Sequence, residues 1–196
     1  MTETTRWLTA DEQRCWRAFL NACQILFGQI DAQLLRDSGM PHAYYEILAH
    51  LSETPGRALR MNQLAEAATF SKSRLSHAVA KLEERGWVVR QSCPTDRRGQ
   101  IAYLTDDGFA VLTAAAPGHV TAVRHALIEA LTPEQVSLLR QISEAIAAAG
   151  AASIATDREL AGCPGVDDPS ATSCLEAMET GEADRSARAE ELAPRP

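Results

Sequence analysis

Residues 71–105 read SKSRLSHAVAKLEERGWVVRQSCPTDRRGQIAYLT, and this stretch decides the fold. Ser71 is a suitable N-cap for a helix over residues 72–85, and Gly86 follows it as the expected C-terminal stop. A β-hairpin with a loop of about ten residues comes next. The apolar side of the helix comprises Leu75, Ala78, Val79 and Leu82, and the two strands of the hairpin are residues 87–90 and 101–104. We therefore expect a short helix that leads directly into a hairpin.

A second short helix precedes the first one. Asn62 is a plausible N-cap for it, and the helix then runs through Ala68 to a turn at residues 69–71. Upstream lie a possible small strand at 58–60 and a helix at about 42–53. Two short helices joined by a turn and followed by a hairpin describe a winged helix-turn-helix, which we place at residues 42–105.

Longer helices flank this part on both sides. Residues 9–36 carry apolar residues at steps of three and four. A helix from Thr105 to about Ala130 should kink at Pro117-Gly118, and Thr132-Pro133-Glu134-Gln135 begins another helix. We predict a mainly α fold with a small β-wing, in which the helices at 9–36 and 106–149 serve dimerisation. The whole domain covers residues 8–150.

Charge is distributed unevenly. The formal net charge is −7, yet residues 57–98 contain nine Lys/Arg against four Asp/Glu. The acidic excess lies from Thr156 onward, where ten Asp/Glu face four Arg. We expect residues 156–196 to be a disordered acidic tail that either aids solubility or competes with DNA for the basic surface. A local basic surface attracts phosphate despite the negative total.

Several classes of protein are disfavoured. No run approaches 18 apolar residues, and the polar N-terminus does not resemble a secretion signal, so we expect a cytoplasmic protein without a membrane span. The five scattered cysteines indicate a reducing compartment. Enzyme motifs such as GxSxG, HExxH or a P-loop are absent, the five histidines lack ligand spacing, and we expect no enzyme, cofactor or metal.

The helix over 72–85 carries the candidate DNA-reading residues. Its side opposite the apolar residues is polar, and its N-terminal half fits a major groove about 12 Å wide. Ser71, Ser73 and the first amides suit phosphates, whereas Arg74, Ser76 and His77 suit base edges. Arg60, Lys72 and Arg90 are expected phosphate contacts. The predicted set for double-stranded DNA is Ser71, Lys72, Ser73, Arg74, Ser76, His77, Lys81, Arg90, Arg97 and Arg98. The alternative is that this polar side of the helix is simply exposed to solvent and binds nothing.

Over about residues 8–148 the chain resembles the MarR family of bacterial transcriptional regulators. The residues that carry the resemblance are Leu35-x3-Gly39, Tyr45-x2-Leu48, Leu64-Ala65, Ser71-Lys72-Ser73, Leu82-Glu83-x-Arg85-Gly86, Asp96-Arg97-Arg98, Leu104-Thr105-x2-Gly108 and Leu131-Thr132-x-Glu134. Three features depart from the pattern: His77 replaces a frequent Arg, Pro41 replaces a common Ser/Thr cap, and the tail has no counterpart.

The resemblance implies a homodimer that binds a palindromic operator, acts as a repressor, and is relieved by a small-molecule effector or by oxidation. It also implies that one wing arginine, Arg97 or Arg98, enters the minor groove while Asp96 holds the other in a salt bridge. A cysteine-based redox switch through Cys15, Cys23 or the more exposed Cys93 is an alternative. So is a protein-interaction module without DNA affinity. Trp7, Trp16 and the tyrosines either line an effector pocket or belong to the core.

Overall fold

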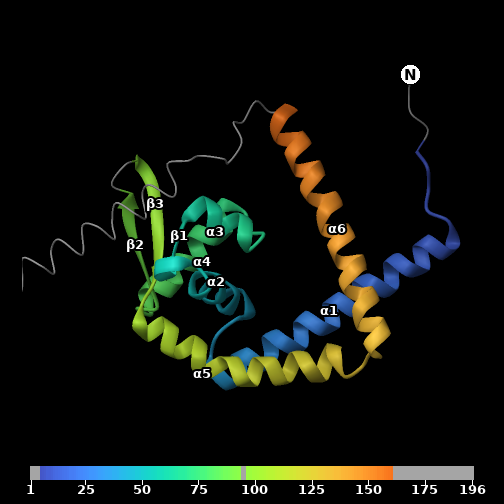
Figure 1. The fold of residues 1–196 in the computed structure, drawn as a ribbon, viewed down its shortest axis with the longest axis horizontal. Coiled ribbons are helices and arrows are strands. Elements are labelled where there is room, and N and C mark those ends of the chain that lie inside the picture. Colours follow the sequence, from blue (N-terminus) through green and yellow to red (C-terminus); the bar gives the residue numbers. More distant parts are fainter. Residues whose placement is uncertain (1–4, 94–95, 161–196) are drawn as a thin grey trace, which may run out of the picture. The chain divides into compact units, whose positions relative to one another are not determined.

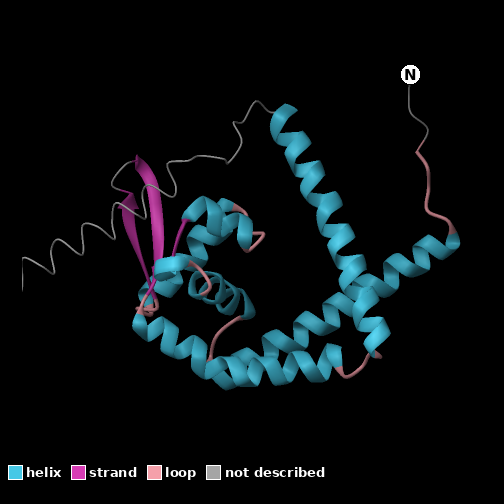
Figure 2. Ribbon diagram, in the orientation of Figure 1, coloured by secondary structure: helices cyan, strands magenta, loops and turns pink. Residues whose placement is uncertain are grey.

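The computed structural model describes residues 5–93 and 96–160, with residues 96–98 and 151–160 described through their backbone alone. Most of this chain is helical, and three short strands form one sheet (Figures 1 and 2). In chain order the elements are α1 (Ala10–Ser38), α2 (His42–Ser52), the 3-10 turn η1 (Pro55–Arg57), β1 (Ala58–Arg60), α3 (Met61–Ala67), α4 (Lys72–Glu84), β2 (Val88–Cys93), β3 (Asp96–Leu104), α5 (Asp106–Val123), the π-helical η2 (Arg124–Ile128) and α6 (Pro133–Leu160). The predicted fold class is confirmed.

The described residues divide into two compact units, residues 5–42 with 115–137, and residues 43–93 and 96–114 with 138–160. In the first unit, α1 begins with a capping box. The backbone N–H of Thr9 donates to Oε2 of Glu12 at 2.7 Å, and the N–H of Glu12 donates back to Oγ1 of Thr9 at 3.3 Å. Gly39 ends the helix in the left-handed conformation at φ 61°. The sequence therefore predicted this helix to within two residues.

Helix α5 contributes its second half to the same unit. Pro117 lies inside the helix without ending it, and the π-helical η2 begins at Arg124. Gly118 lies where a Cβ atom would come within 3.0 Å of the side-chain nitrogen of Gln33. The small residue thus permits a close approach of α5 to α1.

The second unit contains the sheet, whose strand order is β1-β3-β2, with both pairs antiparallel. Val88 pairs with Leu104 and Ser92 with Gln100, and the register shifts between Ser92 and Cys93. Strands β2 and β3 together reach from Val88 to Leu104, so the expected ten-residue loop is wrong. Residues 94 and 95, which separate the strands, lie outside the described residues.

Helices α2, α3 and α4 supply the apolar core of this unit. The apolar repeat predicted for α4 is confirmed, since all four of its members are buried. The other fully buried large side chains of this core are Ile47, Leu48, Leu51, Leu64, Val88 and Ile101. One local prediction is wrong: Arg60, not Asn62, is the N-cap of α3, because the helix begins at Met61.

A threonine joins the turn after α4 to the start of α5. Thr105 donates its hydroxyl to the carbonyl of Gly86 at 2.7 Å and accepts the N–H of Gly108 at 3.0 Å. A Cβ atom at Gly108 would overlap the carbonyl oxygen of Trp87. The Leu-Thr-x2-Gly pattern therefore allows the backbone of α5 to lie directly against the residue that precedes β2.

Helix α6 begins as predicted but ends later. The N–H of Thr132 donates to Oε1 of Gln135 at 2.9 Å, and the N–H of Gln135 donates to Oγ1 of Thr132 at 3.3 Å. The helix continues to Leu160, beyond its expected end near residue 149 and past the expected boundary of the acidic tail at 156. Residues 161–196, the rest of that tail, lie outside the described residues.

Candidate nucleic-acid interface

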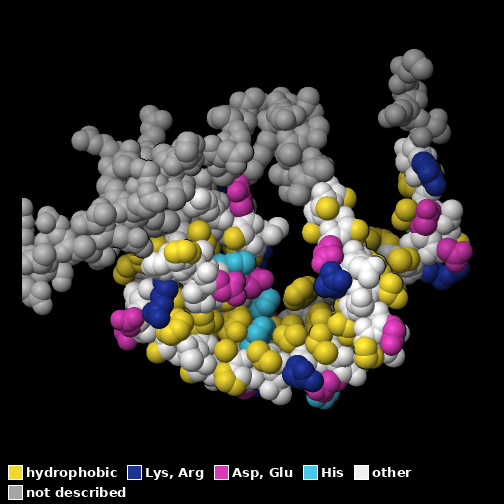
Figure 3. Space-filling model, in the orientation of Figure 1, with side chains coloured by type: hydrophobic (Ala, Val, Ile, Leu, Met, Phe, Trp, Pro, Cys, Tyr) yellow, Lys and Arg dark blue, Asp and Glu magenta, His cyan; other side chains and the backbone are white. Residues whose placement is uncertain are grey.

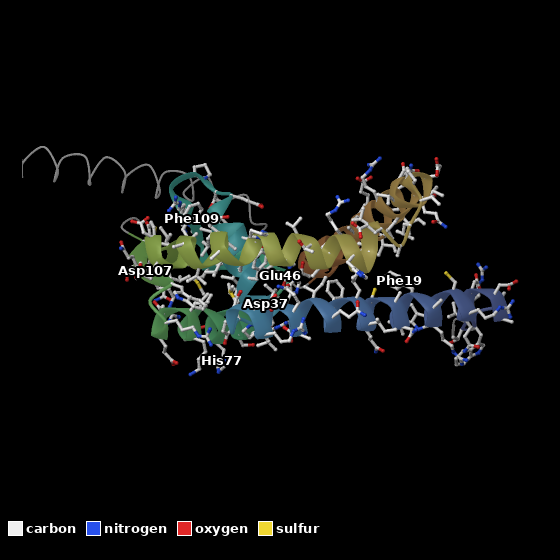
Figure 4. The ribbon with its side chains drawn as sticks, turned by 90° about the horizontal axis from the view of Figure 1, so that it is seen from below. Phe19, Asp37, Glu46, His77, Asp107 and Phe109 are labelled. Carbon is white, nitrogen blue, oxygen red and sulfur yellow. The ribbon has the colours of Figure 1, made fainter. Side chains whose placement is uncertain are left out.

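The N-terminus of α4 is fixed by its cap. Oγ of Ser71 accepts the backbone N–H of Arg74 at 3.2 Å and lies 3.2 Å from Oγ of Ser73. The cap aligns the first turn, while Lys72, Ser73, Ser76 and His77 are all exposed. His77 points outward from α4 (Figure 4). These predicted contact residues therefore form one exposed polar face at the positive end of the helix.

An aromatic ring next to this face positions Arg74. The guanidinium carbon of Arg74 lies 4.0 Å from the centroid of the Phe70 ring. Phe70 is half-buried and directly precedes the cap, and its backbone N–H donates to the carbonyl of Ala65 at 2.8 Å. A guanidinium over a ring face is attracted by the negative face of the ring. Sequence reasoning missed Phe70, although its spacing of four from Arg74 was a usable signal.

Two of the cations in the predicted DNA-contact set, Lys81 and Arg90, also form ion pairs within the protein. Nζ of Lys81 lies 2.8 Å from Oε2 of Glu84, an exposed pair that raises the pKa of the lysine through the hydrogen bond and the charge of the glutamate. The backbone N–H and Nε of Arg90 both donate to the carboxylate of Glu83 at 2.8 Å. Arg90 thus joins β2 to α4, and its side chain is 23% exposed.

The contact with Arg90 also changes the pKa of the Glu83 carboxylate. Hydrogen bonds from the Arg90 side chain and backbone, together with the charge of Arg90, outweigh burial and lower the pKa of Glu83. The residue is therefore ionised at neutral pH and serves as a clamp between the helix and the hairpin. Sequence reasoning quoted Glu83 only as part of a family pattern and did not assign it this role.

Two further residues differ from expectation. Arg60, which we expected as an exposed phosphate contact, is only 6% exposed and lines a pocket together with Lys72 and Ser76. Its guanidinium contacts Sγ of Cys93 at 3.4 Å. Cys93 is itself only 3% exposed, which contradicts the exposed position expected for it. Both side chains belong to the base of the wing.

The first three residues of the wing strand β3 are described through their backbone alone. Asp96, Arg97 and Arg98 form the first three residues of β3, and Asp96 pairs with Cys93. They thus belong to a strand and not to a long loop. Their side chains lie outside the described part of the chain, so the salt bridge of Asp96 and the arginine roles stay predictions.

The long helices leave many apolar side chains exposed. On α1 the exposed fractions are 50% for Trp16 and 44% for Phe19, and on α6 they are 54% for Ile142 and 53% for Ile146. Hydrophobic side chains are visible along α6 in the space-filling view (Figure 3). Trp7 is 83% exposed, and Trp16 is half-exposed with its ring centroid 6.4 Å from that of Phe19, so neither side chain is buried in a core within the described single chain.

The first unit contains two cysteines that we considered as redox sensors and two histidines that we considered as metal ligands. Cys15 is exposed and Cys23 is half-buried, and both are free thiols. His42 stacks on His119 with ring centroids 5.8 Å apart, a pairing that histidine spacing did not reveal. Burial and the nearby His42 lower the pKa of His119. Among the described residues, no group of three or more His, Cys, Asp or Glu side chains is arranged to hold a metal ion.

Residues 5–93 and 96–160 contain no candidate membrane-spanning helix. None of the helices in this part of the chain combines the length and the apolarity needed to cross a bilayer.

Comparisons with known proteins agree on one family. The MarR family matches residues 38–99. Among solved structures, the chain is similar to Sco3205, a MarR family transcriptional regulator from Streptomyces coelicolor in complex with DNA. The identity is 54%, over 73% of this chain and 90% of that one, with a TM-score of 0.71. It is also similar to AbsC, a MarR family transcriptional regulator from the same organism, with 41% identity over 73% and 96% of the two chains and a TM-score of 0.68.

A curated relative matches over a shorter region. Transcriptional regulator HosA from Escherichia coli O111:H- is 34% identical over 73 residues, which are 37% of this chain and 53% of the relative. The chain therefore spans about half the length of this relative.

Proposed function

Because this chain belongs to the MarR family of transcriptional regulators, we propose that it is a sequence-specific, homodimeric repressor that binds double-stranded DNA at a palindromic operator. The observation that carries the proposal is the exposed polar face at the capped N-terminus of α4. The similarity to Sco3205, whose structure contains DNA, supports the same assignment.

The N-terminal turns of α4 enter the major groove in this proposal. Ser71, Ser73 and the first backbone amides of the helix donate to phosphates, because the positive end of a helix attracts anions. Arg74 reads guanine, whose O6 and N7 suit a bidentate guanidinium. Ser76 and His77 read neighbouring base edges. Phe70 holds the Arg74 guanidinium over its ring and restricts the conformations of this side chain before DNA arrives.

The wing supplies a second contact. An arginine at the start of β3, Arg97 or Arg98, enters the minor groove and senses its width. Asp96 holds the other arginine. The clamp between Glu83 and Arg90 fixes the orientation of β2 relative to α4, so the two contacts are made at a defined spacing.

Dimerisation follows from the exposed apolar side chains on α1 and α6. Large apolar side chains at half exposure are costly to leave in water, and burying them stabilises an assembly by about 25 cal/mol per Å². A two-fold axis then presents two α4 helices to successive major grooves, about 34 Å apart. A palindromic site matches that symmetry.

Repression, relief by a small effector and residence in the cytoplasm complete the proposal. The first two rest on the family alone, and the third rests also on the polar N-terminus and the scattered cysteines. Effector binding would weaken DNA binding by favouring a conformation in which the two α4 helices no longer match the spacing of the grooves.

Titrations of DNA against variants test the reading residues. We expect Arg74→Ala and His77→Ala to reduce the ratio between operator and scrambled-duplex affinity, because each contacts bases. A Ser52→Ala variant on α2 serves as a control that leaves the α4 face intact. If neither variant changes the sequence preference of binding, the assignment of α4 as the reading helix is wrong.

A further inference from the structure

We propose that the acidic segment at residues 176–184 binds a cationic pocket between α3, α4 and β3 of the same chain and thereby competes with DNA. The contact between segment and pocket stands by itself, whereas its effect on DNA affinity rests on the proposed function. The pocket encloses about 350 Å³. Its polar side chains are those of Arg60, Asn62, Lys72, Ser76 and Gln100.

The charge of this pocket suits a carboxylate. Two of its side chains are cationic, and among the described residues none that lines the pocket is acidic. Arg60 is 6% exposed and contacts Sγ of Cys93 at 3.4 Å, so this cation has a fixed position. A poorly solvated cation attracts an anion more strongly than an exposed one does. Lys72 adds an exposed ammonium group from the first residue of α4.

Other cations of the same unit already have acidic partners. Arg57, Lys81 and Arg90 each lie within 3.2 Å of a carboxylate oxygen. The pocket differs because two cations meet there without a carboxylate in the lining. An anion supplied from elsewhere in the chain would therefore be attracted to the pocket more than to these ion pairs.

Neutral hydrogen-bond donors complete the pocket. Asn62 of α3, Ser76 of α4 and Gln100 of β3 are exposed and line it from three elements. An ionised carboxylate only accepts hydrogen bonds, through two oxygens with about four acceptor positions. Donors that converge from separate elements can therefore bind one carboxylate together.

The segment that we assign to the pocket lies outside the described residues, and its sequence gives its charge. Residues 176–184 read EAMETGEAD and contain four carboxylates and no Lys or Arg. The flanking parts are less acidic, since 161–175 contain two Asp and 185–196 contain two Glu against three Arg. The basic region at 57–98, with nine Lys/Arg against four Asp/Glu, therefore attracts this segment most strongly.

The chain is long enough to bring the segment to the pocket. Leu160, the last residue of α6, belongs to the same compact unit as α4. Fifteen residues separate it from Glu176. An extended chain covers about 3.3–3.6 Å per residue, so this connection spans up to roughly 50 Å. A small domain is about 30 Å across, and the segment therefore reaches the pocket.

Occupation of the pocket would oppose DNA binding. Lys72 and Ser76 line the pocket and also belong to the α4 face that we assign to DNA. A carboxylate bound between them engages these side chains and repels phosphates. A tether gives an effective concentration on the order of 1 mM, so a contact with a dissociation constant of about 0.1–0.5 mM lowers the apparent DNA affinity about three- to tenfold. The segment is thus an autoinhibitor that operator DNA must displace.

Neutral isosteres in the full chain test the proposal. The test variant is Glu176→Gln/Glu179→Gln/Glu182→Gln/Asp184→Asn. The control variant is Asp167→Asn/Asp168→Asn/Glu190→Gln/Glu191→Gln. Each variant loses four negative charges beyond Leu160, so the two have the same net charge and differ only in which carboxylates remain.

The amide signals of Gly99 and Gln100, recorded by NMR without DNA, report directly on the pocket. We expect the test variant to shift both signals from their wild-type positions and the control variant to keep them. A synthetic peptide of residues 175–185, added to the test variant, should return the signals toward the wild-type positions and saturate. Unshifted signals in the test variant, equal shifts in both variants, or no response to the peptide would overturn the proposal.

Fluorescence anisotropy with a duplex from the region upstream of the chain's own coding sequence measures the effect on DNA binding. The test variant should bind about three- to tenfold more tightly than wild type at low salt, and the control variant less than about twofold more tightly. Equal gains in both variants would assign the effect to general charge repulsion and overturn autoinhibition. If wild type and both variants fail to bind, the proposed DNA binding is wrong, and the NMR signals still decide whether the segment occupies the pocket.

Discussion

The clamp between α4 and β2 gives the sharpest quantitative prediction. Replacing Glu83 by Gln keeps the size of the side chain and one acceptor for the backbone N–H of Arg90, but it removes the negative charge. The wild-type carboxylate accepts that N–H and the Nε of Arg90, each at 2.8 Å. The two side chains are 28% and 23% exposed, so the pair is partly shielded from water. The substitution therefore weakens two charge-assisted contacts at once.

The expected cost follows from this geometry. Hydrogen bonds to charged groups contribute about 1.5–3 kcal/mol each. Since Glu83→Gln weakens them without leaving Arg90 devoid of acceptors, we expect a loss of about 1–2 kcal/mol in the free energy of unfolding. For a chain of this length that lowers Tm by roughly 2–8 °C. The control is Glu84→Gln, the neighbouring residue, whose exposed pair with Lys81 is screened by water and should contribute much less to stability.

The pH dependence has a defined sign. The pKa of Glu83 in the folded chain lies below its ordinary value of 4.5 because of the hydrogen bonds from Arg90. The carboxylate therefore stabilises the fold fully above the pKa of the unfolded chain. As the pH falls below that value the contribution shrinks, and it is lost once the pH passes the lowered pKa of the folded state.

Urea unfolding followed by circular dichroism measures both effects. Wild type, Glu83→Gln and Glu84→Gln are compared at pH 7 and again at successively lower pH. We expect the gap between wild type and Glu83→Gln to be largest at pH 7 and to close as acid protonates the carboxylate. Equal stability of Glu83→Gln and Glu84→Gln at pH 7, or a gap that persists undiminished in acid, would refute the clamp.

Three further changes have definite outcomes. Phe70→Leu should release Arg74 and so reduce discrimination between operator and scrambled DNA about two- to fivefold, without loss of affinity for scrambled DNA. Fluorescence anisotropy measures both affinities, and an equal loss of affinity for the two duplexes would contradict this role of Phe70. Gly108→Ala should destabilise by about 1–3 kcal/mol or more in urea, because its Cβ overlaps a backbone carbonyl, whereas Gly28→Ala meets nothing within 4 Å and should be harmless. Ile142→Glu should convert the dimer into monomers in sedimentation equilibrium, and an unchanged dimer would remove α6 from the interface.

Local signals predicted the reading helix well. Ser71 as cap, a repeat of apolar residues and Gly86 as stop all agreed on α4, which runs from Lys72 to Glu84 with Gly86 at φ 72°. Each of these signals acts within a few residues of its cause. The same holds for the capping box at Thr132, which placed the start of α6 correctly.

Predictions failed where distant segments decide the structure. The wing strands extend into a polar stretch because β2 and β3 pair with each other, and neither carries an apolar alternation there. Arg60 became buried because its strand pairs with Ile101 of β3. The contact between Glu83 and Arg90 requires the chain to turn back at Gly86, so spacing along a single helix does not reveal it.

The C-terminal end of α6 failed for another reason. Its residues near Gly150 are mostly alanine, which offers no apolar periodicity but has the highest helix propensity, and the helix continues to Leu160. For the candidate site, residue types and positions on α4 were predictable, whereas the contact of Arg74 with the Phe70 ring, for which a spacing of four residues was the only signal, was recognised in the folded chain.

The salt dependence of DNA binding by the unmodified chain tests the central claim most directly. Anisotropy of a labelled duplex, taken from the region upstream of the chain's own coding sequence, is followed at rising salt. Four or more phosphate contacts by the two basic surfaces of a dimer predict a loss of affinity of about a hundredfold between about 50 and 200 mM salt. No binding at low salt, or an affinity that does not change with salt, would contradict the account.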